Sequence, residues 1–438
     1  MLLWFIVLTF SKTPIVLMPG LYGSNIQVSY SKSASKFWFC PRHMNHSLLW
    51  LNYNLLLPPF MDCFFELLKG YYDPTTDTIG NPPYHDIDVY DFGGVEGIMY
   101  ADKDGFLGKN NYISLAKLIE KLKNYGYIVK KDLFGAPFDW RIAPVGIENS
   151  FFPKLKKLIE HASESNQNQK VTFIAYSMGS LMAQRFLSQF VSQEWKDRYI
   201  NKLIFLAPAL AGSGISINAM WTKKFSLMYN IESETIHEAI ESSPCLHALM
   251  PNHVAFGESE LVRTPDGKSI TAKELPGFFI EKGKISGNNI KMMAKSEAIT
   301  SKRLNEVNVP VYILYNSGIG TPHSLDFSNG YDKQPVTKMA PGDDTVPSQG
   351  IEWICNNWKM NFPLVCHDFQ SSNGAFSHGE LSNNPYVQEL VYNMTISDHW
   401  ISEKGSKTIY SPYVEIDDLK ETFEIKESMK PQREIINH

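Results

Sequence analysis

Residues 175–179 have the residue types and the spacing of a serine nucleophile. They read Ala-Tyr-Ser-Met-Gly, a small-x-Ser-x-Gly motif with Ala in place of the usual first Gly. The β-branched and aromatic run 171–174 predicts a buried strand, and the apolar residues within 181–187 have helical spacing. A strand-to-helix turn at this point would project the Ser177 hydroxyl above a sheet. We therefore predict that Ser177 is a nucleophile; the alternative is an ordinary strand-helix turn.

A nucleophilic serine needs a base to accept its proton and a carboxylate to orient that base. Residues 341–347 place Asp343 and Asp344 on a loop after a strand, and either carboxylate could orient a histidine. Of the twelve histidines, His378 is the one on a loop after the predicted final strand, 362–369. The chain order Ser, Asp, His is the order found in α/β-hydrolases.

Two backbone amides could stabilise the oxyanion that forms when a serine attacks an ester. The first is the amide of Met178, directly after the nucleophile. The second lies in loop 19–24, Pro-Gly-Leu-Tyr-Gly-Ser, which follows the apolar strand 14–18. Its glycines would let the amide of Leu21 turn toward the site. An ordinary Pro-Gly turn is the alternative.

The elements around these residues follow the rhythm of a parallel α/β sheet. An amphipathic helix is predicted over 113–125, a strand begins at 127–129, and a further strand is predicted over 202–206. After residue 206 the alternation of strands and helices stops, which indicates a cap or lid inserted over the site. The predicted parts are a leader (1–12), a first core part (13–206), the cap (207–304), a second core part (305–400) and a polar tail with a helical portion (401–438).

The composition is that of a globular protein with a large core or with one domain carrying insertions. The chain has 438 residues, of which 43% are hydrophobic and 20% charged. The formal net charge is -5 and the chain has no long run of Lys or Arg, which argues against nucleic acid as a partner. A neutral or lipid-like substrate is easier to accommodate.

Several features favour passage through the secretory pathway. Residues 1–10 are almost wholly apolar, as in a short signal or anchor, although they lack a basic start and a good cleavage site; a first buried strand is the alternative. Sequons begin at Asn45 and Asn393, and five cysteines could form two disulfides and leave one thiol. We therefore expect the mature protein to be secreted or to reside in a lysosomal or other endomembrane lumen.

An aromatic and aliphatic stretch over 36–66 is bracketed by Cys40 and Cys63. A disulfide between them would close a loop and contribute about 3 kcal/mol by restricting the unfolded chain. The loop could sit at a membrane interface with Trp50 and Leu51 at the headgroup level, or it could be ordinary core; both interpretations stay open. Trp140 is a further candidate for lipid contact, or part of a structural turn around a buried tryptophan with an Asp–Arg pair. An oxidising compartment makes a metal site at these cysteines and nearby histidines unfavourable, and no metal or organic cofactor is predicted.

Together these pieces resemble the lecithin:cholesterol acyltransferase-like lipases, which include lysosomal phospholipase A2-type transacylases and phospholipid:diacylglycerol acyltransferases. The resemblance extends over roughly residues 14 to 400, that is, over most of the chain. Its anchors are residues 14–20, Cys40 and Cys63 around Trp50, 136–144, 175–179, 206–208, 342–346 and His378.

The resemblance implies an α/β-hydrolase fold with a cap and a disulfide-tied interface loop. It implies a triad of Ser177, Asp343 and His378, with the first aspartate of the pair as the orienting one. Leu21 and Met178 match the oxyanion positions, and the segment from Cys40 to Cys63 matches a lid loop used at lipid surfaces.

The sequence departs from the family pattern at two places. Tyr176 stands before the nucleophile, where the family commonly has His. Ile313 offers no thiol where the family's second disulfide usually reaches a sheet strand. We therefore predict that Cys355 pairs with Cys366 and that Cys245 stays free.

The chemistry implied is attack of Ser177 on a glycerophospholipid ester, formation of an acyl-enzyme, and transfer of the acyl group to water, a sterol or another lipid alcohol. The partners implied are a phospholipid membrane or lipoprotein surface and the lipid acceptor. A neutral-lipid esterase with the same triad and a catalytically inert lipid-binding protein are the alternatives. The sequence leaves open the acceptor, the ester position, the headgroup and the oligomeric state.

Overall fold

The computed structural model describes residues 12–32, 35–102, 114–224, 233–371, 376–396 and 406–409. The predicted leader, apart from Lys12, lies outside the described residues, as does the predicted tail apart from 406–409. The predicted domain limits remain a prediction.

The centre of the fold is a seven-stranded sheet with the order β16-β15-β12-β9-β8-β1-β7. All its neighbouring strands are parallel except β16, which pairs antiparallel with β15. β1 and β12 are buried along their whole length, as expected for strands covered on both faces. The strands are β1 (Ile15–Met18), β7 (Leu133–Gly135), β8 (Val171–Tyr176), β9 (Ile200–Leu206), β12 (Val311–Tyr315), β15 (Leu364–Asp368) and β16 (Ser406–Ile409).

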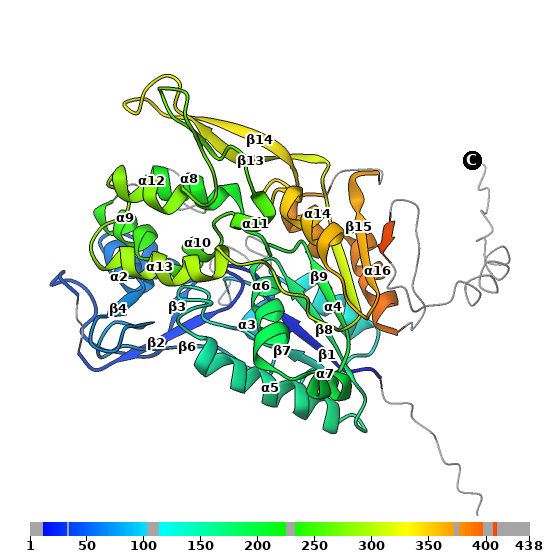
Figure 1. Cartoon of the computed structure of the whole chain (residues 1–438). Helices are drawn as coiled ribbons and strands as arrows, with labels where there is room; N and C mark the ends of the chain where they lie inside the picture. The colour runs from blue at the N-terminus through cyan, green and yellow to red at the C-terminus, as the bar shows by residue number, and fades with distance from the viewer. Residues whose placement is uncertain are drawn as a thin grey trace, which may run out of the picture.

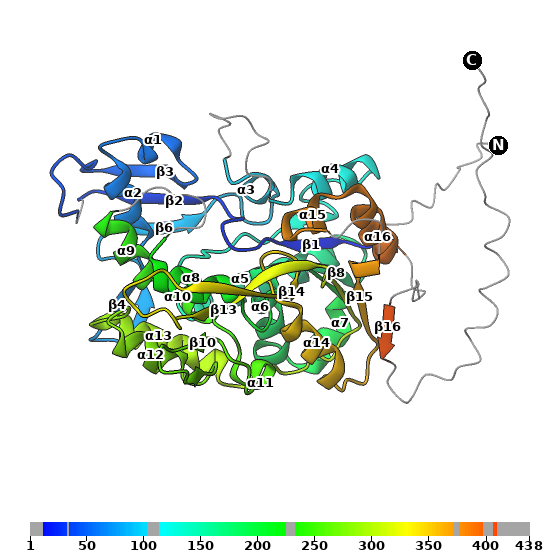
Figure 2. The same ribbon diagram turned by 90° about the horizontal axis from the view of Figure 1, so that it is seen from above.

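Helices cover both faces of this sheet, and successive side chains of a strand enter different hydrophobic clusters. Val16 packs in the larger cluster, and its neighbours Ile15 and Leu17 pack in the smaller one. Figure 2 shows α4, α15 and α16 on one side of the strands and α6, α7 and α14 on the other. Helix α5 and the π-helical turn η1 also pack in the larger cluster. The elements that cover the sheet are α4 (Ala116–Asn124), α5 (Glu148–Glu164), α6 (Met178–Arg185), η1 (Phe186–Phe190), α7 (Gln193–Tyr199), α14 (Ser348–Asn357), α15 (His378–Asn383) and α16 (Pro385–Ile396). The predicted α/β-hydrolase fold class is confirmed.

Short helices fill the predicted cap, and most of them gather on one side of the molecule in Figure 1. They are α8 (Gly214–Thr222), α9 (Glu234–Glu241), α10 (Pro244–Ala248), α11 (His253–Phe256), α12 (Leu275–Glu281) and α13 (Asn288–Thr300). Two short strands of the cap, β10 (Val262–Arg263) and β11 (Ser269–Ile270), join a long hairpin of β13 (Ile319–Asp326) and β14 (Val336–Gly342) in a second, four-stranded sheet. This hairpin, which runs along the top of the molecule in Figure 1, was not predicted from the sequence.

The disulfide-tied region forms a small lobe of its own elements. It contains the three-stranded sheet β3-β2-β6, the hairpin β4-β5, and helices joined to them. The elements are β2 (Ile26–Tyr30), β3 (Met44–Trp50), α1 (Tyr53–Leu56), α2 (Met61–Leu68), β4 (Tyr71–Asp73), β5 (Thr78–Gly80) and β6 (Asp86–Val89). The next helix, α3 (Glu96–Met99), instead packs with α4 in the smaller hydrophobic cluster. In the core, the 3-10 turn η2 (Phe369–Ser371) follows β15.

Both predicted disulfides are present in the structure. Cys40 is bonded to Cys63, and Cys355 of α14 is bonded to Cys366 of β15. Cys366 pairs in register with Ile313 on the neighbouring strand. The strand cysteine of the second disulfide therefore lies on β15, next to the β12 position that the family resemblance implies. Cys245 of α10 is free and buried, as expected.

Two predicted elements differ in the structure. Residues 127–129 do not form a strand, because the chain turns back at Lys130, which has φ 61°, and the amide of Leu133 bonds to the carbonyl of Ile128. The buried strand is therefore β7, four residues later. Part of the predicted tail, 406–409, is an edge strand of the central sheet, which the charge-rich sequence around it did not indicate.

Candidate active site

Ser177 occupies a sharp turn between β8 and α6. Its φ of 53° and ψ of -124° lie outside the regions that residues other than glycine normally adopt. Such a strained turn is the form of a nucleophile elbow, which lifts the serine hydroxyl away from both flanking elements. Two glycines permit the tight packing around it: a Cβ atom on Gly20 would lie 2.7 Å from the Cβ of Ser177, and one on Gly179 would lie 2.3 Å from the carbonyl oxygen of Pro19.

The structure brings Ser177, His378 and Asp343 into one hydrogen-bonded chain. His378 Nε2 lies 2.9 Å from Ser177 Oγ, and His378 Nδ1 lies 2.8 Å from Asp343 Oδ2. The three residues come from distant elements: the elbow after β8, the residue after β14, and the first residue of α15. This arrangement can remove the serine proton and stabilise the imidazolium that results.

Asp343 and Asp344 have different surroundings, although the sequence left both open as the orienting carboxylate. Asp343 is buried, and its Oδ1 accepts hydrogen bonds from the amides of Thr345 (3.1 Å) and Val346 (2.7 Å), which leaves Oδ2 for the histidine. The carboxylate of Asp344 instead accepts a bond of 2.6 Å from the Thr345 hydroxyl. Asp343 is therefore the aspartate that contacts the imidazole.

The electrostatic surroundings favour a protonated His378. Burial lowers the pKa of His378, but the charge and hydrogen bond of Asp343, together with the charge of Asp344, outweigh burial and raise the pKa above its usual range. Burial raises the pKa of Asp344, the hydrogen bond from Thr345 opposes this, and the charge of Asp343 adds to the rise. Two carboxylates thus stabilise the positive imidazole that proton transfer creates.

The raised pKa of His378 predicts how activity depends on pH. A general base must be neutral, so kcat/KM is expected to fall as the pH drops through a pKa above about 6.5, the ordinary value for histidine. Replacing Asp344 by asparagine removes one of the charges that raise this pKa and is expected to move the midpoint to lower pH. A pH–rate profile of both proteins on a soluble ester measures the shift. A wild-type midpoint well below 6.5, or an unchanged midpoint in Asp344→Asn, would contradict this electrostatic account.

The two predicted oxyanion amides lie beside the nucleophile. Met178 is the first residue of α6, so its amide belongs to the helix end where N–H groups lack intrahelical acceptors and where negative charge is favoured. Leu21 follows Gly20, which packs directly against Ser177. The roles of both amides remain a prediction that this placement supports.

Trp50, Leu51 and Trp140 are buried, which agrees with the core interpretation of the segment and not with an exposed position of Trp50 and Leu51 at a membrane interface. Trp50 and Trp140 pack around Tyr22, with ring centroids 5.1 Å and 4.8 Å from the tyrosine ring. The indole of Trp50 donates a hydrogen bond of 2.8 Å to the carbonyl oxygen of Tyr22. The two tryptophans therefore support the loop that carries Leu21, because they pack against the ring of the next residue, Tyr22.

The alternative interpretation of the Trp140 segment as a structural turn agrees with its surroundings. Arg141 is buried and contacts Asp139 at 2.6 Å, the carbonyl oxygen of Leu67 at 3.1 Å and the side chain of Asn81 at 2.6 Å. The guanidinium thus connects this turn to the end of α2 and to the loop after β5. Burial raises the pKa of Asp139 despite the opposing charge of Arg141.

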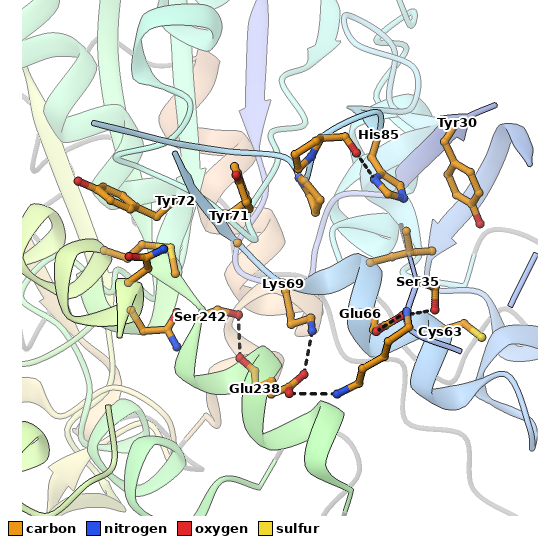
Figure 3. A pocket seen from close by; sticks show the side chains of 18 of the residues that line it. Tyr30, Ser35, Cys63, Glu66, Lys69, Tyr71, Tyr72, His85, Glu238 and Ser242 are labelled. Atoms are coloured by element: carbon orange, nitrogen blue, oxygen red, sulfur yellow. Dashed lines mark hydrogen bonds and ion pairs between the residues drawn. The ribbon is translucent and has the colours of Figure 1, made fainter. Parts of the chain in front are cut away.

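A cavity of about 520 Å³ lies between the disulfide-tied lobe and the cap, and none of the residues of the predicted triad lines it. Figure 3 shows Glu238 of α9 reaching across it to lysines of the lobe. Glu238 pairs with Lys36 at 3.1 Å and with Lys69 at 2.8 Å. The amide of Gly70 also bonds to the carbonyl oxygen of Ser242, at 2.9 Å. These contacts hold the cap helix α9 against the lobe.

In the described part of the chain, no group of three or more His, Cys, Asp or Glu side chains is arranged to bind a metal ion. Within the same residues, no helix combines the length and the apolar composition needed to cross a bilayer.

A mostly parallel sheet, a serine on a strained strand-to-helix turn, and an aspartate and a histidine from later segments define an α/β-hydrolase. The family model described as "Lecithin:cholesterol acyltransferase" matches residues 45–305. The chain belongs to this family, as the resemblance in the sequence predicts.

Relatives of known name span most of the chain. It is 29% identical to "Lysosomal phospholipase A and acyltransferase" of Bos taurus over 356 residues, which cover 80% of this chain and 84% of the relative. It is 27% identical to "Phosphatidylcholine-sterol acyltransferase" of Mus musculus over 352 residues, covering 79% and 77%. Among solved structures, a chain in the crystal structure of the Tle4-Tli4 complex is similar with a TM-score of 0.48 and 14% identity, covering 89% of this chain and 99% of that one.

Proposed function

We propose that this protein is a serine-dependent lipid acyltransferase and phospholipase A that acts on glycerophospholipids. The observation that supports it most directly is the contact of His378 with both Ser177 and Asp343, at 2.9 and 2.8 Å, within a chain of this family. One of the two relatives is named as a phospholipase A and acyltransferase, and the other as a phosphatidylcholine-sterol acyltransferase. Each of these reactions breaks or forms an ester bond.

In the first half of the proposed reaction, Ser177 Oγ attacks the ester carbonyl while His378 Nε2 accepts the hydroxyl proton. The new oxyanion accepts hydrogen bonds from the amides of Leu21 and Met178, and Asp343 stabilises the imidazolium. The ester C–O bond then breaks, and the lysophospholipid leaves with the proton from His378. The acyl chain remains on Ser177.

In the second half, an acceptor hydroxyl attacks the acyl-enzyme. His378 removes the proton of the acceptor and returns it to Ser177 Oγ when the acyl group departs. Water as the acceptor gives a free fatty acid, and a sterol or other lipid alcohol gives an acylated lipid. The ratio of the two products depends on how well the site excludes bulk water and how well it binds an alcohol next to the acyl-enzyme.

Incubation with phosphatidylcholine vesicles, with and without a sterol or a short-chain alcohol, tests this function. Free fatty acid and acylated acceptor are followed separately. We expect the acylated product when an alcohol is present, because an acyl-enzyme can be captured by either nucleophile. Turnover of neutral esters alone would favour a neutral-lipid esterase, and no turnover of any lipid would favour a lipid-binding protein.

We propose that the disulfide-tied lobe carries the contact with a phospholipid membrane or lipoprotein surface. Its segment 36–66 exposes Trp38, Leu57 and Phe60, whose exposed fractions are 87%, 53% and 37%. Exposed apolar side chains of this kind insert at the headgroup level of a bilayer. The contact surface would thus lie in the predicted segment but on different side chains from Trp50 and Leu51.

Replacing Trp38 by alanine is expected to weaken binding to phosphatidylcholine vesicles by about tenfold to a hundredfold, since burial of a large apolar side chain contributes about 1.5–3 kcal/mol. Turnover of a soluble ester should not change. Tyr386→Ala is the matched control, because Tyr386 is an aromatic residue of α16 with an exposed fraction of 47%, outside the lobe. Vesicle sedimentation measures binding. Equal losses in both variants would show that any exposed aromatic residue contributes and would count against this surface.

We propose that the chain passes through the secretory pathway and ends outside the cell or in a lysosomal or other endomembrane lumen. Two disulfides support this, because they persist in oxidising compartments. The sequon residue Asn45 is exposed on β3, and Asn393 is partly buried in α16. Treatment of the secreted protein with a peptide N-glycosidase, with Asn45→Gln and Asn393→Gln as comparisons, tests both sites; no mobility change would refute them.

A further inference from the structure

Tyr176, the residue before the nucleophile, contacts the histidine. Its hydroxyl donates a hydrogen bond of 3.1 Å to the main-chain carbonyl oxygen of His378, 202 residues along the chain. Its ring also lies against the imidazole, with centroids 5.3 Å apart and planes inclined by 36°. The family resemblance places a histidine at this position, so a tyrosine hydroxyl contact is a property of this chain's own sequence.

The main chain of His378 is held by two hydrogen bonds to other segments, and the bond from Tyr176 is the second of them. The amide of His378 donates to the carbonyl oxygen of Asp343 at 2.7 Å, and its carbonyl oxygen accepts from Tyr176. The first bond fixes the histidine relative to the aspartate, and the second fixes it relative to the elbow. Because Tyr176 is covalently joined to Ser177, the second bond links the base to the nucleophile directly.

The ring of Tyr176 has little freedom to move away from this position. A Cβ atom on Gly20 would lie 3.2 Å from its Cδ1, so the loop before Leu21 packs against one side of the ring. Other parts of the ring pack on the smaller hydrophobic cluster of the sheet. Burial, followed by the charge of Asp343, raises the pKa of the hydroxyl, which therefore stays protonated and able to donate.

We propose that Tyr176 is a positioning residue that sets the distance between His378 and Ser177 through the main chain of the histidine. The inference rests on the proposed roles of Ser177 and His378. The Tyr176 hydroxyl bonds to the main chain of His378 and not to the imidazole nitrogens, which bond to Asp343 and Ser177, so its effect is exerted through the placement of the imidazole. Small displacements of a base from its hydrogen-bonding position are sufficient to slow proton transfer.

Tyr176→Phe tests this role, because it keeps the ring and removes only the hydroxyl. Loss of one hydrogen bond of ordinary strength corresponds to a fall in kcat of about threefold to tenfold. The rate at which a fluorophosphonate labels Ser177 is expected to fall by the same factor. KM is expected to stay within about twofold of the wild-type value, because substrate binding does not use this bond.

Tyr30→Phe is the matched control, because the Tyr30 hydroxyl donates a bond of 3.0 Å to the carbonyl oxygen of Pro41, away from the triad. It is expected to retain the wild-type kcat, and thermal melting of both variants measures any loss of folded protein. The inference is overturned if Tyr176→Phe keeps its kcat within twofold, or if its loss is matched by Tyr30→Phe or explained by melting. An active Ser177→Ala would refute the proposed function itself, whereas a fully active Tyr176→Phe beside an inactive Ser177→Ala refutes only the role of Tyr176.

Discussion

Ser177→Ala is expected to lower the turnover of phosphatidylcholine by about 10⁶-fold, the loss that follows removal of the nucleophile from a serine triad. The histidine and aspartate cannot compensate, because no acyl-enzyme forms without the serine oxygen. Measurement of fatty acid release and of acyl transfer to an alcohol gives the size of the effect for both acceptors. Both activities should fall together, since they share the same intermediate.

The substitution should leave folding and lipid binding unchanged. Ser177 is buried, its side chain is small, and alanine has the same Cβ atom, which already fits beside Gly20. Vesicle binding and thermal melting equal to those of the wild type would therefore assign the loss to chemistry. Hydrolysis that persists at more than a thousandth of the wild-type rate would show that another residue is the nucleophile.

Asp343→Asn is expected to lower kcat by about 10⁴-fold while leaving the fold intact. Asparagine can still accept bonds from the amides of Thr345 and Val346, but it presents no charge to the imidazole. The imidazolium then loses its stabilising partner, and the amide of asparagine can hold the ring in the wrong tautomer. Turnover of a soluble ester at several pH values measures the loss.

The neighbouring Asp344→Asn is the control that the chain itself provides. Asp344 affects the pKa of His378 by its charge, but its carboxylate bonds to Thr345 rather than to the imidazole. It is expected to lose less than about tenfold in kcat at the pH optimum. A larger loss in Asp344→Asn than in Asp343→Asn would reverse the roles assigned to the two aspartates.

The residues of the candidate active site could be identified from the sequence because the signals that mark them are local. The small-x-Ser-x-Gly pattern between a strand and a helix is contained in residues 171–187, and Asp343 and His378 each follow a strand in the expected order. The structure places all three within hydrogen-bonding distance. The choice between Asp343 and Asp344 rested on resemblance, because both have the same chemistry and only the path of the backbone separates them.

The aromatic residues were harder to place, because burial in a core and insertion into a membrane both remove the side chain from water. Trp50 and Trp38 lie in one segment with similar neighbours, yet Trp50 is buried and Trp38 is exposed. The difference depends on Tyr22 and Trp140, which reach Trp50 only in the folded chain. Composition alone carries no information on such contacts.

The hairpin β13-β14 was missed for a related reason. Its partner in the second sheet is β10, which belongs to the cap. The paired positions Val262 and Leu325 are 63 residues apart in the chain. Only two residues of β10 take part, too few for a pattern in the sequence. Likewise, the contact between Tyr176 and His378 joins residues far apart in the chain, and the departure of Tyr176 from the family pattern was its one visible sign.

The burial of Cys245 has a consequence for the permanence of the two disulfides. Exchange between disulfides requires attack by a thiolate, and Cys245 carries the one thiol left over from five cysteines. Its side chain is enclosed in the larger hydrophobic cluster, and burial raises its pKa to about 12, so in the folded protein it is both inaccessible and protonated. The packing of α10 therefore protects the two cysteine pairs from thiol–disulfide exchange in the folded protein, without any change in the disulfides themselves.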